Sequence, residues 1–189
     1  HSYSPDSSVS QGGGSVWLDR ANAHFASRQI DSASFAYQEA CSSLFEEKSW
    51  ADYVAALNGL GRTDLHRGRF AEAISTLNTA LEVEEQNAGC SPLERAQTYN
   101  LLGYAYMALE QWEKSRYLIE TGLSIRMTAL GDDSPLVGPS QYMLGVILYK
   151  LGDHQAATLH LEEALRLQAV TPGVESSDFA STLVTLGMI

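Results

Sequence analysis

A segment of about 42 residues recurs along this chain of 189 residues, and no other feature narrows the possible folds as much. A small residue returns at steps of 40, 42, 42 and 42 residues, at Ala21, Gly61, Gly103, Gly145 and Gly187. A leucine stands directly before it in four units, whereas Arg20 stands there in the first. Large or long residues stand three places before this leucine position, at Trp17, Leu57, Tyr99, Gln141 and Leu183. These spacings predict one face of a helix in every unit.

A second block follows each small residue at a constant distance. Its small positions are Ala33, Ala73, Ser115 and Ala157, and again Ala40, Ala80, Gly122 and Ala164. The large residues between them are Tyr37, Leu77, Ile119 and Leu161. Small residues let two helices approach closely while large ones fill the gap, so each unit is predicted to be a helical hairpin. Gly68 and Gly152 suit the left-handed conformation at the turn between the two helices.

Glycine and proline in the connectors set the boundaries of the units. The sequence predicts a flexible Ser- and Gly-rich segment over residues 1–15 and a repeat array over 16–189. Within the array the repeats are expected at about 16–49, 50–92, 93–136 and 137–176, with a partial fifth at 177–189. Several hairpins are needed because stacked neighbours share one core that a single hairpin cannot form.

One repeat carries a recognisable signature. Tyr99-x-x-Leu102-Gly103-x-x-Tyr106, followed by Ser115-x-x-x-Ile119, resembles the motif of the tetratricopeptide repeat family. The 42-residue period and the connector at residues 130–135 are similar to the longer-helix subtype found in kinesin light chains and many bacterial regulators. The resemblance covers the chain from Val16 to its end. It departs from the pattern in the first repeat, at Arg20 and Ala21, and in the third, where Ser115 and Gly122 replace alanines.

The resemblance implies an all-α fold, a right-handed α-α superhelical solenoid whose first helices line a concave groove. Carried over position by position, the groove residues are Leu18, Asn22, Phe25, Asn58, Arg62, Leu65, Asn100, Tyr104, Met107, Tyr142, Val146 and Tyr149. Asn58 and Asn100 hold the same place in successive repeats, where an amide can both donate to and accept from an extended peptide. At any one position, packing against a neighbouring helix remains the alternative. The basic clamp of chaperone-binding members is absent, since its places carry Leu18, Asn22, Gly59, Gln97 and Leu101.

The composition restricts the partners. A net charge of −11, from 23 acidic and 12 basic residues, argues against nucleic acid, whose phosphates require Lys and Arg. A protein or peptide partner is expected instead. No stretch has the length of apolar sequence that a membrane span needs, so membrane insertion is not expected. Two cysteines, far apart in sequence, form no disulfide framework, which favours a reducing compartment such as the cytoplasm.

No group of residues suggests catalysis, a cofactor or a metal. His24, His66, His154 and His160 fall on different faces or repeats, and no known metal-ligand spacing occurs. Cys41 stands in a column otherwise held by leucines and is expected in the core. Acidic pairs such as Asp132–Asp133 are expected at solvated helix ends. The chain is therefore predicted not to be an enzyme.

Three questions stay open at this stage. Residues 1–15 are either a tag remnant and natural tail, or a ligand peptide at Ser2–Gln11 joined through the linker Gly12–Ser15. The leading function is a protein-protein interaction scaffold that binds a peptide segment of a partner in the groove. The alternative is a regulatory or sensor domain of a larger protein that acts through intramolecular contacts or oligomerisation. The oligomeric state does not follow from the sequence.

Overall fold

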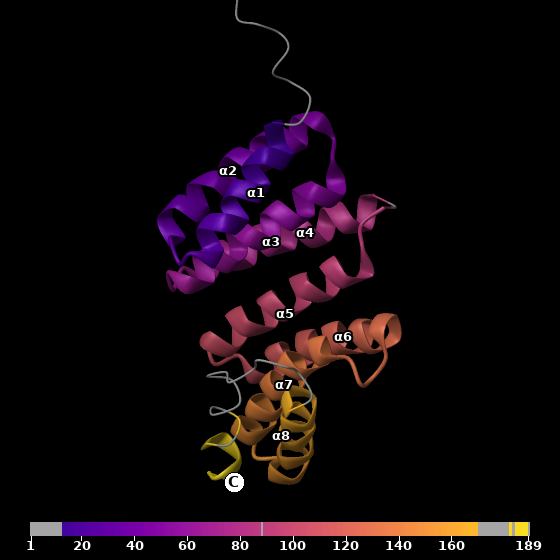
Figure 1. Cartoon of the computed structure of the whole chain (residues 1–189). Coiled ribbons are helices and arrows are strands. Elements are labelled where there is room, and N and C mark those ends of the chain that lie inside the picture. Colours follow the sequence, from indigo (N-terminus) through magenta and orange to yellow (C-terminus); the bar gives the residue numbers. More distant parts are fainter. Residues whose placement is uncertain (1–12, 88, 170–181, 183, 189) are drawn as a thin grey trace, which may run out of the picture. The chain divides into compact units, whose positions relative to one another are not determined.

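The computed structural model describes residues 13–87, 89–169, 182 and 184–188 (Figure 1). Helices account for nearly all of these residues, and no strand occurs among them, so the expected all-α class is confirmed. The helices are α1 (Gly13–Ala26), α2 (Ile30–Glu47), α3 (Trp50–His66), α4 (Phe70–Gln86), α5 (Pro92–Ala108), α6 (Trp112–Leu130), the 3-10 helix η1 (Pro135–Val137), α7 (Gly138–Leu151) and α8 (His154–Ala169). Within the described ranges, no helix combines the length and the apolar character needed to cross a membrane.

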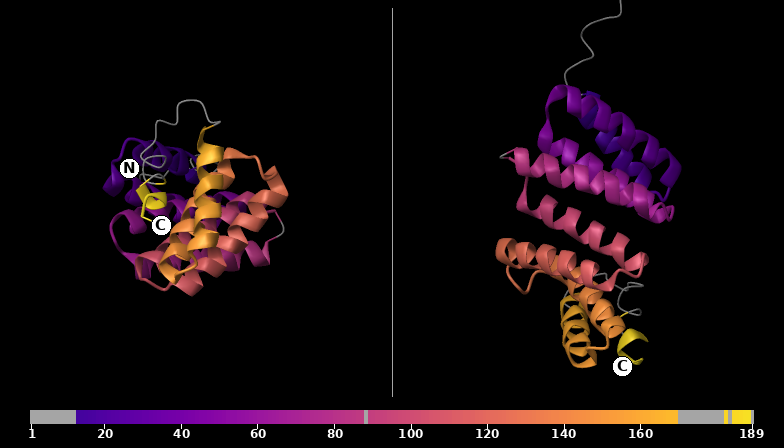
Figure 2. Two further views of the ribbon diagram at one scale, coloured as in Figure 1. Left: turned by 90° about the horizontal axis from the view of Figure 1, so that it is seen from below. Right: turned by 180° about the vertical axis from the view of Figure 1, so that it is seen from behind.

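The chain divides into two compact units, the first ending at Ser91 and the second beginning at Pro92. Unit 1 contains the hairpins α1/α2 and α3/α4, and unit 2 contains α5/α6 and α7/α8 together with η1. The two helices of each hairpin lie side by side in every view (Figure 2).

Small residues bring the helices of unit 1 together as the repeat predicts. Ala21 and Ala33 are completely buried between α1 and α2. A Cβ atom added to Gly61 on α3 would lie only 2.8 Å from the side chain of Leu77 on α4. Close approach at these positions therefore depends on the missing or minimal side chain.

Unit 2 repeats this arrangement. A Cβ atom on Gly103 would lie 2.4 Å from Ile119, and one on Gly145 would lie 2.6 Å from Leu161. Ser115, which stands where other repeats have alanine, is fully buried and donates a hydrogen bond to the Gly103 carbonyl at 2.7 Å. A buried hydroxyl is acceptable here because this bond satisfies it. The main core cluster of the unit contains Ile119, Leu123, Val137, Leu144, Ile147, Leu148, Ala157 and Leu167.

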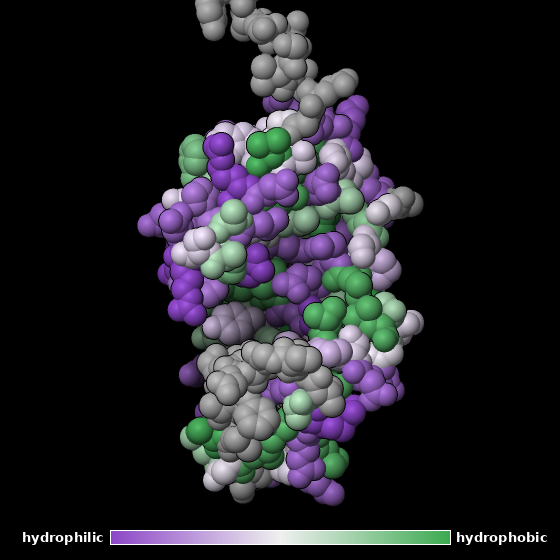
Figure 3. Space-filling view, viewed as in Figure 1, coloured by the Kyte–Doolittle hydropathy of each residue, from purple (hydrophilic) through white to green (hydrophobic). Residues whose placement is uncertain are grey.

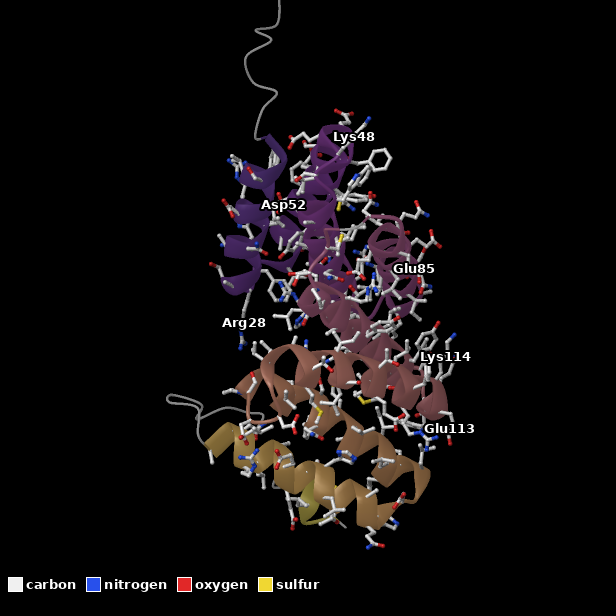
Figure 4. The ribbon with its side chains drawn as sticks, turned by 90° about the vertical axis from the view of Figure 1, so that its right-hand side faces the viewer. Arg28, Lys48, Asp52, Glu85, Glu113 and Lys114 are labelled. Atoms are coloured by element: carbon white, nitrogen blue, oxygen red, sulfur yellow. The ribbon has the colours of Figure 1, made fainter. Side chains whose placement is uncertain are left out.

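All four hairpin turns use one residue in the left-handed conformation at the same repeat position. Gly68 and Gly152 have φ values of +72° and +85°, which confirms the predicted glycine turns. Arg28 and Glu110 hold the corresponding places in the other two hairpins, with φ values of +56° and +58°. The side chain of Arg28 points away from the ribbon (Figure 4), so the requirement at this turn is the left-handed backbone conformation and not a particular side chain.

The start of α1 differs from the expectation. Gly13, Gly14 and Ser15, predicted to belong to a flexible linker, form the first turn of the helix. The backbone N–H of Gly14 donates to Glu47 Oε1 at 3.0 Å, and Gly14 packs so closely on Leu44 that a Cβ atom would lie 2.6 Å away. A carboxylate at a helix N-terminus accepts a hydrogen bond from an otherwise unpaired N–H and interacts favourably with the positive end of the helix dipole. Composition alone does not reveal these partners, because both lie on α2.

The expected fifth helix is described only in part. Residues 182 and 184–186 are helical, and the other positions of 177–189, apart from Gly187 and Met188, lie outside the described residues. Residues 1–12, which include the alternative of a ligand peptide at Ser2–Gln11, also lie outside the described residues.

Candidate functional site

The predicted groove residues fall into two sets, one on each unit, which we call the first-helix faces. In unit 1 the face consists of Leu18, Asn22 and Phe25 on α1, with Asn58, Arg62 and Leu65 on α3, and Leu18 packs partly buried against the core. In unit 2 it consists of Asn100, Tyr104 and Met107 on α5, with Tyr142, Val146 and Tyr149 on α7.

A buried tyrosine organises the face of unit 1. Tyr37 on α2 is completely buried, and its hydroxyl donates to Asn22 Oδ1 at 2.6 Å. Arg62 Nη2 donates to the same hydroxyl at 3.2 Å. The tyrosine ring fits because Gly59 has no side chain, since a Cβ atom there would lie 2.1 Å from the ring. Two predicted face residues are thus linked through a residue that the sequence indicated only as packing.

Arg62 is also held by an aromatic ring. Its guanidinium carbon lies 3.9 Å from the centroid of the Phe25 ring, a typical cation–π geometry. The Phe25 ring in turn contacts the His66 ring edge-on, with centroids 5.2 Å apart. Arg62 Nε is buried without a hydrogen-bond partner in the described part of the chain. The cation is therefore fixed mainly by stacking and by Tyr37.

Asn58 and Leu65, which also belong to this face, are largely enclosed. Asn58 is only 5% exposed and Leu65 is also buried. The structure thus gives these two positions little surface with which to contact a ligand.

Asn100 in unit 2 lies within a buried polar network. It is 7% exposed, and its Nδ2 donates to Ser140 Oγ at 2.6 Å, which links α5 to α7. Ser140 Oγ also accepts from Arg126 Nη1 at 3.0 Å, while Arg126 Nη2 donates to Gln97 Oε1 at 2.8 Å. Desolvation lowers the pKa of the Arg126 guanidinium. The amide predicted to meet a peptide therefore already serves a contact between hairpins.

The remaining residues of this face offer more surface. Tyr104 is 43% exposed, and Met107, Tyr142, Val146 and Tyr149 are half-buried. Met107 and Tyr149 pack with one side against the core cluster, and the Tyr149 ring contacts His154 edge-on at 5.3 Å. Figure 3 shows hydrophobic residues reaching the surface among hydrophilic ones in the viewed part of the molecule.

The residues considered for chemistry have ordinary structural surroundings. His24 Nδ1 lies 2.6 Å from Gln29 Oε1, and His160 Nδ1 lies 2.6 Å from Gln141 Oε1. Burial lowers the pKa of His160, and the charge of Glu120 opposes that effect. Across the described residues, no group of three or more His, Cys, Asp or Glu side chains is placed to hold a metal ion.

Cys41 packs in the core of unit 1, as expected from its column. Desolvation raises the pKa of its thiol to about 12, so the nucleophilic thiolate is scarce at neutral pH. Cys90, which is distant in sequence, packs against the same cluster of Val54, Leu57 and Ala80 as Cys41 does. The two cysteines are therefore closer in the fold than their separation in sequence suggested.

Comparison with known proteins shows what the repeats are similar to. The family model described as tetratricopeptide repeat matches residues 94–169. BtubC (BKLC) from P. vanneervenii is 21% identical with a TM-score of 0.74, and the match covers 89% of this chain and 68% of that one. Kinesin-light-chain TPR-like repeats from Podosopora anserina are 20% identical with a TM-score of 0.69, covering 92% of this chain and 83% of theirs.

A third solved structure, the apo form of RapI, is 17% identical with a TM-score of 0.69. That match covers 95% of this chain and 48% of RapI. No curated protein matches the chain. At these identities the solved structures establish a shared fold, and the family model matches the third and fourth hairpins. Residues 94–169 therefore match the tetratricopeptide repeat family, and the hairpins of the chain have the fold of kinesin-light-chain-like repeats.

Proposed function

We propose that the chain is a protein-interaction scaffold that holds a peptide segment of a partner against its first-helix faces. Repeats of this family are generally scaffolds for protein interaction and not catalysts. The observation that carries the proposal is the exposure of Tyr104, whose side chain is 43% exposed on α5, the first helix of its hairpin. Tyrosine offers a large rigid contact area with a polar tip at a small entropic cost.

The surroundings of Tyr104 support a binding surface in unit 2. Met107 lies one turn further along α5, and the half-buried Tyr142, Val146 and Tyr149 supply corresponding positions on α7. An aromatic side chain with a flexible methionine beside it is typical of surfaces that adapt to a peptide. The proposal assigns direct contact to these five residues.

In unit 1 the proposal assigns direct contact to Asn22, Phe25 and Arg62, whose side chains are exposed or half-buried. Asn58, Leu65 and Asn100 are placed in a supporting role. Asn100 would have to release Ser140 before its amide nitrogen could meet a ligand. Breaking a buried hydrogen bond costs free energy, so direct use of Asn100 is disfavoured.

A matched pair of tyrosines tests the proposal. Random displayed peptides of roughly a dozen residues are selected on the whole chain, and the affinity of the enriched peptides is measured by fluorescence anisotropy. Tyr104→Ala is expected to weaken binding by about thirtyfold, the effect of truncating an aromatic hot spot. Tyr117→Ala removes a tyrosine that is 68% exposed on the second helix α6 and should leave the affinity unchanged.

Two results would argue against peptide binding on these faces. One is the failure to enrich any peptide, and the other is an equal effect of the two substitutions. The alternative, a regulatory or sensor domain acting through intramolecular contacts or oligomerisation, predicts no free peptide ligand and a molar mass that changes with concentration in light scattering. The cytoplasm remains the proposed compartment, and its support is the low cysteine content, two in 189 residues.

A further inference from the structure

A second candidate site lies in unit 1, away from the first-helix face. A depression of about 420 Å³ opens between α1 and the beginning of α2. Its lining residues are Trp17, Arg20, His24, Asp31, Ser32, Phe35 and Ala36. None of them belongs to the face proposed to hold a peptide, so this depression is not explained by that function.

Two aromatic rings form the apolar wall. The Trp17 and Phe35 rings meet edge-on, with centroids 6.0 Å apart and an angle of 83° between their planes. Phe35 is 56% exposed, and exposure of its apolar ring to water is unfavourable. The corresponding places of the other three hairpins carry Ser75, Tyr117 and Leu159, so the repeat itself does not require phenylalanine. An aromatic corner of this kind is suited to an apolar ring of a ligand.

Arg20 supplies a positive charge beside this wall. Its guanidinium carbon lies 4.6 Å from the centroid of the Trp17 ring. In the described part of the chain it makes no ion pair with a carboxylate. The other units carry leucine at this position, which makes Arg20 a specific departure from the repeat. In a chain with 23 acidic and only 12 basic residues, an arginine without an acidic partner is notable.

The acidic residue of the depression is already engaged. Asp31 forms an ion pair with Arg67, which also donates to Ser34 Oγ at 2.8 Å. The negative charge of Asp31 is therefore offset within unit 1, and Arg20 is left as the lining charge without a counterion. The His24 ring is oriented by its contact with Gln29 and adds a further polar group to the same side.

We infer that this depression binds an organic carboxylate with an apolar ring, the ring packing on Trp17 and Phe35 and the carboxylate pairing with Arg20. Stacking on Trp17 already restricts the guanidinium, so less conformational entropy is lost when it binds. Guanidinium and carboxylate also match in geometry and can form two parallel hydrogen bonds. The acidic excess of the chain repels anions at long range, so the site is suited to a ligand with one carboxylate and not to a polyanion.

A shape-matched pair of probes tests this inference. N-acetylphenylalanine carries the carboxylate, and N-acetylphenylalaninamide has the same ring without the charge. Binding is followed by NMR through the indole N–H signal of Trp17, assigned by comparison with Trp17→Phe. The carboxylate is expected to bind about tenfold more tightly than the amide, the size of effect typical of a hydrogen bond to a charged group.

The repeat provides the variants. Arg20→Leu installs the residue of the other units and should remove the preference for the carboxylate while the amide binds as before. Phe35→Ser copies the second hairpin and should weaken both probes. Tyr117→Ser, the same position in the third hairpin, serves as the control and should change neither. Thermal unfolding of each variant confirms that unit 1 remains folded.

Three outcomes would overturn the inference. If acid and amide bind equally, or if Arg20→Leu leaves the preference intact, Arg20 only covers Trp17 against solvent. If the Trp17 signal does not move with either probe, the depression is not a site. Comparing N-acetylphenylalanine with the tetrapeptide Ala-Ala-Ala-Phe shows whether a free acid or a chain end fits better. Peptide selection on the first-helix faces is independent of all these results.

Discussion

Arg62 on α3 donates a hydrogen bond to the hydroxyl of Tyr37 on α2 at 3.2 Å, and this hydroxyl donates in turn to Asn22 on α1 at 2.6 Å. One phenolic oxygen thus connects three helices and the two hairpins of unit 1. Because the Tyr37 side chain is completely buried, the bonds are shielded from competing water. The hairpins are fixed here by polar contacts in addition to the apolar core.

Tyr37→Phe is expected to lower the free energy of unfolding of unit 1 by about 1 kcal/mol, because Arg62 and Asn22 lose a common partner while the ring still fills its space. Urea unfolding followed by the fluorescence of Trp17 and Trp50 measures this loss. Tyr117→Phe, in which an exposed hydroxyl is removed, should leave the unfolding midpoint unchanged. Equal midpoints for Tyr37→Phe and the unsubstituted chain would show that the hydroxyl does not link the helices energetically.

The repeat predicted the helical hairpins but not the role of Tyr37. Small residues such as Gly61 and Gly103 recur at fixed steps, and that spacing depends only on local helical geometry. The partners of the Tyr37 hydroxyl depend instead on how three helices meet. The available signal was a single tyrosine in a column otherwise occupied by Leu77, Ile119 and Leu161.

Asn100 shows the same limit for the candidate site. Its place in the repeat predicted an amide that faces a ligand, whereas the side chain is buried and bonded to Ser140. Gly122, one of the departures from the family pattern, explains the burial. A Cβ atom at Gly122 would lie 2.6 Å from Asn100 Oδ1 and 3.0 Å from the Ala96 carbonyl oxygen. The glycine and the asparagine are therefore complementary, and neither alone reveals this.

Gly122→Ala is accordingly expected to destabilise unit 2 by about 1–3 kcal/mol, since the added methyl group forces Asn100 or the α5 backbone to move. Gly138→Ala is the matched control, because its Cβ atom would lie at an ordinary 3.5 Å from Leu167. That substitution should stabilise α7 by up to about 1 kcal/mol through the higher helix propensity of alanine. Differential scanning calorimetry of both variants measures the two effects, and a stable Gly122→Ala chain would contradict the close packing.

At the left-handed position of the hairpin turns, introducing a glycine should raise the stability of the unit, and removing a glycine should lower it. Glu110 adopts φ of +58° where Gly68 and Gly152 stand in other hairpins. Glu110→Gly should therefore stabilise unit 2 by about 0.5–1 kcal/mol, since a non-glycine residue in this conformation is strained. Gly152→Ala should destabilise it by about 1 kcal/mol. An added methyl group there meets no atom within 4 Å, so the loss would be purely conformational.

Chemical denaturation of the two variants under identical conditions provides this comparison. Shifts of opposite sign are expected. If both substitutions shift the midpoint in the same direction, the turn conformation is not the dominant factor at this repeat position.

Because the pKa of the Cys41 thiol is raised in the folded chain, the free energy of unfolding is expected to fall at alkaline pH. Desolvation raises its pKa from 9.0 to about 12 in the folded chain, so the unfolded state releases its proton first as the pH rises. The stabilisation associated with the protonated thiol is therefore complete below about pH 9 and is lost progressively between pH 9 and 12. Burial also raises the pKa of Tyr53, and the charge of Cys41 adds to that shift, so both groups act in the same direction.

Cys41→Ala should consequently lose less stability between pH 7 and pH 10 than the unsubstituted chain, although its packing defect lowers stability at both values. The measured quantity is the difference in unfolding free energy between the two pH values for each chain. A second measurement follows alkylation of the Cys41 peptide by iodoacetamide with mass spectrometry, which should be slow in the folded chain and fast in urea because only the thiolate reacts. Equal alkylation rates in the two conditions would mean that the thiol is accessible and that its raised pKa does not control its reactivity.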